Sequence, residues 1–369
     1  MTEHATGPVA VLGATGVVGR AAVRMLTRLG IGDLRLGART PPQGAGPEWR
    51  PVDADDPAAL AAFCAGTRLV LNCAGPSNLL MDRVARAALT AGSDYVDVSG
   101  DGPTHRLLSG SPVLAGRTAV LSAGMLPGLA NVVPKTLADD LTSARLVVYA
   151  GGIEPFAPAS AGDLALSLDS SDAEHWYGET LAAWSGGRRR RNALPVREDV
   201  EVAGFPGRVT TMPFLTADAE RLARSTGLAE LHWHNVFIGS TLRLTLSRLR
   251  GRVPADPAAL APIVAEIGAA AELDLAGLDP FYLMAFTLHR ADRVDTAVLR
   301  TPSSFELTAA TAAHTVAAVL SGAITPGLHY ADDVLDSRGL LDAVAALGAL
   351  PVHRTHRHAH DEPMEAGSL

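Results

Sequence analysis

The sequence has little of what several common protein classes require. Cysteine occurs twice in 369 residues, at Cys64 and Cys73, which excludes a disulfide framework and a zinc site built from cysteines. Both fall in predicted core elements, so we expect buried, inert thiols. The longest Ala/Leu-rich segment, residues 256–278, is interrupted by acidic residues and predicts a helix in water rather than a membrane span. Because the N-terminal residues show no basic and apolar leader, we expect a cytoplasmic protein.

Positive charge is also scarce. Lysine and arginine total 31 against 39 acidic residues, a net charge of −8, so the whole chain offers no basic footprint for nucleic acid. Lys135 is the only lysine, and no tyrosine is followed by a lysine four positions later. The sequence therefore excludes the Tyr–Lys mechanism of short-chain dehydrogenases. A Schiff-base enzyme would have to use Lys135, for which a surface charge near the start of a predicted helix is the simpler interpretation.

Apolar residues are plentiful, and a hydrophobic content of 47% over 369 residues suffices for two domains with their own cores. Residues 1–150 alternate between strand and helix patterns, which predicts an α/β fold with a Rossmann-type, doubly wound parallel sheet. The strands are expected near 8–12, 34–38, 68–72, 94–98 and 118–122, and the helices near 17–30, 57–64, 78–91 and 128–139.

The pattern changes near residue 144. A half-buried strand at 230–238 and a hairpin formed by 283–290 and 294–300 predict a second, α+β domain with a mainly antiparallel sheet. We expect residues 1–140, with returning helices at about 303–350, to form the first domain and 141–302 to form a substrate and dimerisation domain. Residues 353–369 carry four histidines among charged and small residues and are expected to be a flexible tail, with a weak transition-metal site as the less favoured alternative.

The most informative motif is a glycine series that follows the first predicted strand. Gly13 permits a tight turn, Gly16 lets backbone N–H groups approach a pyrophosphate, and Gly19 lets the next helix pack close to the strand. The order strand, glycines, helix favours dinucleotide binding. A tight turn without a ligand is the alternative.

The residues at the end of the second predicted strand indicate which dinucleotide the chain binds. An NAD enzyme usually has an acid near this point to hold the ribose 2′-hydroxyl, but here Arg39 and Thr40 follow the strand. A guanidinium pairs well with a 2′-phosphate, so NADP(H) is preferred over NAD(H), with a solvated arginine as the alternative. Asp53, further along, could bind adenine or cap the helix that begins near Pro57.

Six motifs follow one another in an order and spacing that resemble a known family. They are Gly13 to Arg20, Leu36 to Arg39, Val52-Asp53, Asn72 to Pro76, Asp94 to Asp101 and Gly124 to Gly128. The chain is similar in these motifs, and in residues 306–310 and 321–329, to the saccharopine dehydrogenase/reductase-like family. The resemblance implies a Rossmann NADP(H) domain, an inserted α+β domain, and hydride transfer to C=N or, in some branches, C=C bonds.

The resemblance also implies roles for individual positions. It assigns the pyrophosphate loop to Gly13, Thr15, Gly16, Val17, Val18 and Gly19, phosphate selection to Arg39, the loop beside the nicotinamide ribose to Asn72, Gly75 and Pro76, and the rim of the active site to Ser99, Gly100, Asp101, Gly124 and Pro127. The chain departs from the family at Asp101, where Glu is common, and at Leu126, where Asp is common.

A proton donor is the least determined part of the predicted site. Hydride addition to an imine needs an acid nearby, or an iminium that is already protonated. The candidates are Asp97, Asp101 and His105 at the predicted crevice, and His232 or His234 on the later strand, where alternate residues share a face. A lone histidine is more often structural than catalytic.

A run of four arginines, Arg188 to Arg191, is predicted to be a solvated loop or a mobile lid that recruits an anionic or carrier-bound substrate. We expect an NADPH-dependent reductase of imines that acts on a small molecule, forms a homodimer, and binds neither nucleic acid nor membranes. An enoyl reductase of the same family and a non-catalytic NADP-binding redox sensor are the alternatives.

Overall fold

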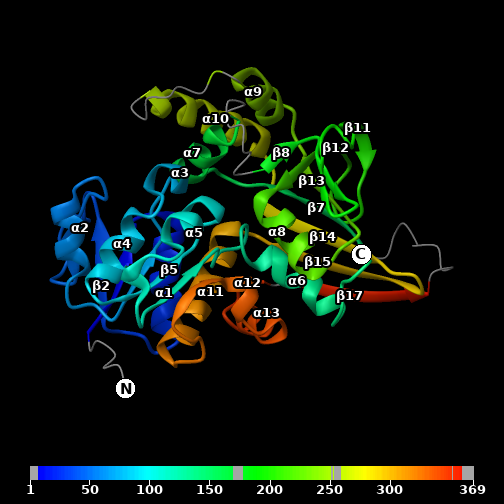
Figure 1. Cartoon of the computed structure of the whole chain (residues 1–369). Coiled ribbons are helices and arrows are strands. Elements are labelled where there is room, and N and C mark those ends of the chain that lie inside the picture. The colour runs from blue at the N-terminus through cyan, green and yellow to red at the C-terminus, as the bar shows by residue number, and fades with distance from the viewer. Residues whose placement is uncertain (1–6, 169–177, 251, 253–258, 351, 360–369) are drawn as a thin grey trace. The chain divides into compact units, whose positions relative to one another are not determined.

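A computed structural model describes residues 7–168, 178–250, 252, 259–350 and 352–359. The chain divides into two units (Figure 1). Unit 1 contains Met1–Leu129 and Phe305–Ala349, and unit 2 contains Ala130–Ser304 and Leu350–Leu369. The first boundary thus falls at residue 129, inside the helix that the sequence predicts near 128–139. The following paragraphs take each unit by itself.

Unit 1 is built on a seven-stranded sheet in the order β16-β6-β5-β4-β1-β2-β3, with every pair parallel. The strands are β1 (Val9–Leu12), β2 (Leu34–Ala38), β3 (Trp49–Pro51), β4 (Leu69–Asn72), β5 (Asp94–Asp97), β6 (Thr118–Leu121) and β16 (Gly327–Tyr330). The strand order reverses between β1 and β4, and ligands of such sheets bind at that point, beyond the carboxyl ends of the strands. The predicted Rossmann-type sheet is confirmed.

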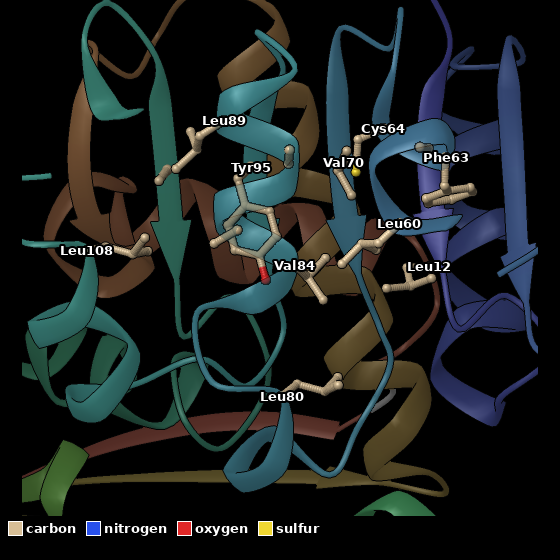
Figure 2. Close-up of a cluster of buried hydrophobic side chains, with 14 of the residues drawn as sticks. Leu12, Leu60, Phe63, Cys64, Val70, Leu80, Val84, Leu89, Tyr95 and Leu108 are labelled. Carbon is tan, nitrogen blue, oxygen red and sulfur yellow. The ribbon is translucent and has the colours of Figure 1, made fainter. Parts of the chain in front are cut away.

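Helices lie between these strands. They are α1 (Val17–Arg28), α2 (Pro57–Cys64), α3 (Ser77–Leu80), α4 (Arg83–Thr90), α5 (Gly102–Leu108), the 3₁₀ turn Pro112–Leu114, α11 (Ser304–Leu320), α12 (Ala331–Val334) and α13 (Ser337–Ala346). Figure 2 shows one layer of the core, in which Leu60, Val84 and Leu108 from α2, α4 and α5 pack with Val70 and Tyr95 of the sheet. The ion pair between Arg24 of α1 and Glu306 joins α1 to α11.

Unit 2 contains a ten-stranded mixed sheet. Its main path is β10-β9-β13-β7-β14-β15-β17, and β12, β11 and β8 extend it from β13. The strands are β7 (Arg145–Ile153), β8 (Gly178–Thr180), β9 (Ala183–Ser185), β10 (Arg188–Arg190), β11 (Arg197–Glu201), β12 (Arg208–Thr216), β13 (Glu230–Phe237), β14 (Phe281–His289), β15 (Arg293–Thr301) and β17 (Val352–Ala359). β13 and β7 are parallel, and the other described pairs are antiparallel, in agreement with the predicted α+β domain.

The helices that belong to unit 2 are α6 (Leu129–Leu137), α7 (Pro158–Leu166), α8 (Ala217–Thr226), α9 (Thr241–Leu249) and α10 (Leu260–Leu275). Asp274 of α10 accepts hydrogen bonds from the backbone N–H groups of Thr241 and Leu242, so one helix caps the start of another. Within the described part of the chain, no helix is both long and apolar enough to cross a membrane.

Two segments differ from the prediction. The flexible tail expected from residue 353 is instead strand β17 as far as Ala359, because its backbone pairs antiparallel with β15 from Val352 to Ala359; residues 360–369 lie outside the described part. The arginine run is not a free loop. It forms β10, where Arg189 pairs with Glu179 and Glu220, and Arg191 also pairs with Glu179.

Candidate functional site

The glycine turn after β1 is set by backbone contacts. Gly13 has φ +79°, a conformation that favours glycine, and a Cβ there would lie 2.8 Å from the Ala74 nitrogen. A Cβ on Gly19 would lie 2.2 Å from the Gly13 carbonyl oxygen, so Gly19 is required for helix α1 to pack against the turn. Gly16 differs, because its φ is −69° and its nearest contact is 3.2 Å away. Gly13 and Gly19 therefore build the turn, and Gly16 leaves space beside it.

The N-terminus of α1 is open to solvent. Gly16 occupies the cap position and supplies no side-chain hydrogen bond, and the first turn contains no acidic residue. Gly16 and Val17 are exposed, and Thr15 and Val18 are half-buried. Backbone N–H groups at such a helix end attract anions. The predicted pyrophosphate residues therefore lie together around an accessible, electropositive helix end.

Arg39 and Thr40 follow β2, the strand that pairs with β1, and both are exposed. Gly13 and Ala14 donate backbone hydrogen bonds to the Gly37 carbonyl, which ties the glycine turn to the end of β2. Among the described residues Arg39 has no hydrogen-bond or ion-pair partner, so its guanidinium is available to a phosphate. These contacts agree with the predicted selection of NADP(H).

Asp97 lies at the carboxyl end of β5 and is 2% exposed. Its Oδ2 accepts hydrogen bonds from the Tyr95 hydroxyl and, at 3.1 Å, from Asn72 Nδ2, while its Oδ1 accepts from the backbone N–H groups of Ser99 and Gly100 at 2.9 Å. Burial and the neighbouring Asp97 carboxylate raise the pKa of Tyr95 well above its usual value, so its hydroxyl stays a donor. This network makes Asp97 a positioning residue for the loops beyond β4 and β5.

Asn72 has the same role at the end of β4. Its side-chain Oδ1 accepts from the Ala74 backbone N–H at 3.1 Å, while its Nδ2 reaches Asp97. The loop that contains the predicted residues Gly75 and Pro76 is thus fixed from both sides, by Asn72 and by the turn at Gly13. The amide acts on the backbone of the site.

The loop after β6 completes the carboxyl-end rim. Ser122, which is fully buried, has φ +54° and donates both its N–H and its hydroxyl to the Gly100 carbonyl. A Cβ on Gly124 would lie 2.4 Å from the Val98 carbonyl oxygen, so the loop containing Gly124 and Pro127 lies directly against the end of β5. A buried non-glycine residue in this conformation marks a site whose surroundings enforce it.

Two acidic candidates have defined local roles. Asp53 accepts a hydrogen bond from the Asp55 backbone N–H at 3.0 Å, and the residue that caps α2 is Asp56, which accepts from Ala58 and Ala59. The interpretation of Asp53 as the helix cap is therefore wrong, because Asp56 stands next to the helix and Asp53 does not. Asp101, half-buried, occupies the cap position of α5 without a side-chain capping bond.

His232 and His234 lie in unit 2, on one face of β13. The His234 ring stacks on Tyr149 with centroids 4.8 Å apart, and its buried Nδ1 has no hydrogen-bond partner among the described residues. Burial, with help from the charges of His232 and Arg197, lowers the pKa of His234 to about 4. Burial also lowers the pKa of His232, despite the nearby Glu230. Both rings are therefore neutral near pH 7.

The sequence did not single out three residues of this rim. Ser122 could have been suspected as a polar residue directly after a buried strand. Thr308 of α11, whose hydroxyl accepts from the Met125 N–H at 3.3 Å, lies in the segment 306–310 that carries the family resemblance, but no role was assigned to it because it is distant in sequence from the rim. Arg20 of α1 was read as part of a motif, but its side chain donates to the Thr15 carbonyl inside the glycine turn.

Comparisons with known proteins bear on this site. Residues 9–112 match the family described as the saccharopine dehydrogenase NADP binding domain. A probable mitochondrial saccharopine dehydrogenase-like oxidoreductase from Arabidopsis thaliana is 42% identical over 50 residues, which cover 14% of this chain and 11% of that protein. In fold, the chain is similar to apo saccharopine dehydrogenase (L-Glu forming) from Saccharomyces cerevisiae, with a TM-score of 0.62, 15% identity, and coverage of 95% of this chain and 100% of the other.

These matches confirm the family resemblance and the fold class predicted from the motifs. The matched segment contains the glycine turn, Arg39, Asn72 and Asp97, so the coenzyme of unit 1 is NADP(H). The residues present fit that coenzyme, because the helix end is accessible and uncapped by any side chain and an unpaired guanidinium follows β2.

Proposed function

We propose that this chain, whose residues 9–112 match a saccharopine dehydrogenase NADP binding domain, is an NADPH-dependent reductase that transfers hydride to the C=N bond of a small biosynthetic intermediate. The single observation that carries the proposal is the glycine turn: it presents an accessible helix N-terminus within a segment that matches an NADP binding domain. The exposed Arg39 beside it supplies a partner for the 2′-phosphate.

Different residues of unit 1 would bind different parts of the coenzyme. The helix end at Gly16 to Val18 would bind the pyrophosphate, and Arg39 with Thr40 would bind the 2′-phosphate. The bound coenzyme supplies the hydride. Asn72 and Asp97 fix the backbone loops beyond β4 and β5, against which the nicotinamide ribose would lie.

The hydrogen bonds of Asp97 favour an imine over an enoyl substrate. Its carboxyl oxygens accept four hydrogen bonds in a buried position, so the group is arranged as an acceptor that holds the loops and not as a proton donor to a substrate. His232 and His234 are neutral near pH 7. An imine can take its proton from water before hydride transfer, as an iminium, whereas a C=C bond needs a proton delivered to carbon. Of the candidate donors only Asp101 and His105 are then left, and C=N reduction is the reaction that does not depend on them.

The test is a turnover assay on the full chain. NADPH absorbance should fall with one or more members of a panel of cyclic and linear imines, and deuterium from NADPH labelled at C4 should appear in the product. A matched panel of enoyl thioesters should give no turnover. Turnover on enoyl substrates alone would favour the C=C reductase. Saturable NADPH binding without turnover on either panel would favour the redox sensor.

A further inference from the structure

Helix α1 carries a positive charge where helices normally carry a negative one. The partial positive charge of a helix N-terminus favours Asp or Glu in the first turn. In α1 the first turn has no acid, and Arg20 lies at the fourth helical position. Its side chain does not extend away from the helix end but turns back, so that Nη1 donates to the carbonyl of Thr15. A cation is therefore held against an end that is already electropositive.

The other arginines of α1 show what ordinary pairing would look like. Arg24, one turn later, forms an ion pair with Glu306 of α11. Arg28 lies in the last turn, where positive charge is favourable, and donates to the Leu347 carbonyl at 3.1 Å. Arg20 is exposed and has no acidic partner among the described residues. Of the three, it alone opposes the helix dipole without compensation within the protein.

A local rule that is broken without compensation often marks a functional site. An anion bound at the glycine turn would lie beside the Arg20 guanidinium, because Thr15, to which Arg20 donates, lies between Gly13 and Gly16. Here the carbonyl of Thr15 fixes the long side chain beforehand, which lowers the entropy that a free arginine would lose on binding.

We propose that Arg20 is a second cationic contact to the coenzyme and that it binds the pyrophosphate, which NADPH and NADH share. This inference rests on the proposed function and adds that two different arginines provide coenzyme selectivity and coenzyme affinity. Arg39, after β2, distinguishes the two coenzymes by the 2′-phosphate. Arg20, on the glycine turn, holds either coenzyme equally. The two guanidiniums therefore contribute to affinity and to selectivity separately.

The experiment is calorimetric titration of the full chain and its Arg20→Gln variant with NADPH and NADH. We expect Arg20→Gln to weaken both coenzymes by the same factor, about tenfold for a lost charge-assisted hydrogen bond. Two fragments sharpen the assignment. ADP carries the pyrophosphate and should lose affinity in the variant, whereas adenosine 2′,5′-bisphosphate, which lacks it, should lose much less. Selective loss of NADPH and of adenosine 2′,5′-bisphosphate would overturn the assignment to the pyrophosphate.

Two controls separate binding from structure. Arg24→Gln removes an equal charge one turn away, from a residue that already has a partner, and should leave coenzyme affinity within about twofold of wild type. Without coenzyme, the melting temperature of Arg20→Gln should equal or exceed that of wild type, since a charge opposing the dipole is removed. A lowered melting temperature together with lost affinity would make Arg20 a structural brace and overturn the proposal.

Failure of this inference is distinguishable from failure of the proposed function. If wild type binds NADPH and Arg20→Gln binds it equally well, only the role of Arg20 is wrong. If wild type shows no saturable binding of NADPH, the proposed function is wrong as well. Restoration of most of the affinity by Arg20→Lys would support charge as the origin of the effect, because lysine keeps the charge without the planar guanidinium.

Discussion

Tyr95 and Asp97 stand two residues apart on the same face of β5, and the Tyr95 hydroxyl donates a hydrogen bond to Asp97 Oδ2 at 2.5 Å. Both side chains are buried, at 0% and 2% exposure. Because Asp97 also holds Asn72 and two backbone N–H groups, this pair connects the core of unit 1 to the loops of the candidate site. Stability and coenzyme binding should therefore be coupled through it.

Replacing Asp97 should destabilise unit 1 rather than only stop turnover. Asp97→Ala strands the buried Tyr95 hydroxyl and the Asn72 amide, at about 1–3 kcal/mol for each unsatisfied group, so we expect a loss of roughly 3 kcal/mol. Tyr95→Phe removes one donor and should cost about 1 kcal/mol. Urea unfolding, followed by intrinsic fluorescence, measures both. An Asp97→Ala protein as stable as wild type would contradict the positioning role.

The glycines of the turn should separate into structural and coenzyme-binding positions. In Gly19→Ala the new Cβ would lie 2.2 Å from the Gly13 carbonyl oxygen, so α1 must shift and the protein should lose about 1–3 kcal/mol of stability. In Gly16→Ala the nearest contact is 3.2 Å, so thermal stability should be nearly unchanged while NADPH affinity falls. Thermal melts and calorimetry on the two variants test this. Equal effects of both substitutions on stability would contradict it.

Arg39 should control coenzyme selectivity. Arg39→Ala removes a charge-assisted hydrogen bond to the 2′-phosphate and should weaken NADPH binding by about 1–3 kcal/mol, with NADH almost unaffected. The ratio of the two dissociation constants is the measurement. Arg35, on the preceding strand β2, donates instead to the Phe63 and Ala65 carbonyls, so Arg35→Ala is a matched control that should leave the ratio unchanged. An equal loss for both coenzymes in Arg39→Ala would remove the assignment.

His234 should make the protein less stable in acid. Its pKa is lowered from 6.5 to about 4 in the folded protein, so the unfolded chain binds the proton more readily. The stability that follows from the neutral ring is fully present above pH 6.5 and is lost as pH falls toward 4, on the order of 2–3 kcal/mol. Arg197 and His232, which face the ring, act in the same direction.

The check on His234 is a comparison of wild type with His234→Gln by urea unfolding between pH 7.5 and 4.5 (~3 pH units). The variant should lose less stability over this interval than wild type. Proton NMR of the ring in the wild type should show no protonation above about pH 5. A ring that titrates near its ordinary pKa would contradict the burial-based account and restore His234 as a proton donor at neutral pH.

The strands of unit 1 were predictable because buried parallel strands are short apolar runs that end at glycines or polar residues. Val9 to Leu12 and Leu69 to Asn72 are examples of such runs. In unit 2 the alternation of apolar and polar residues predicted β13 and the hairpin of β14 and β15, but the short, charged strands gave no such signal. The arginine run, Arg188 to Arg191, is the clearest case, because Arg189 and Arg191 pair with Glu179 and Arg189 also pairs with Glu220, which no local pattern reveals.

The candidate site was predictable only as far as the motifs extend. Arg39, Asn72 and Asp97 could be placed at strand ends from the sequence, but not their partners. Asp97 was one of the candidate proton donors, and the sequence could not show the four hydrogen bonds that occupy it, which come from Asn72 on the neighbouring strand and from its own strand and loop. Arg20 could be placed in the glycine motif from the sequence, but the direction of its side chain, on which its proposed role depends, could not.

Unit 1 is assembled from two separated stretches of chain, and this has a consequence for biosynthesis. β16 pairs with β6 through Gly327 and Thr118, and Arg24 pairs with Glu306. During translation the first 129 residues leave the ribosome before their edge strand β16 and helix α11. Unit 1 therefore cannot be completed until residues 130–304 of unit 2 have been synthesised. Nascent chains arrested before residue 305 should therefore expose apolar surface to chaperones.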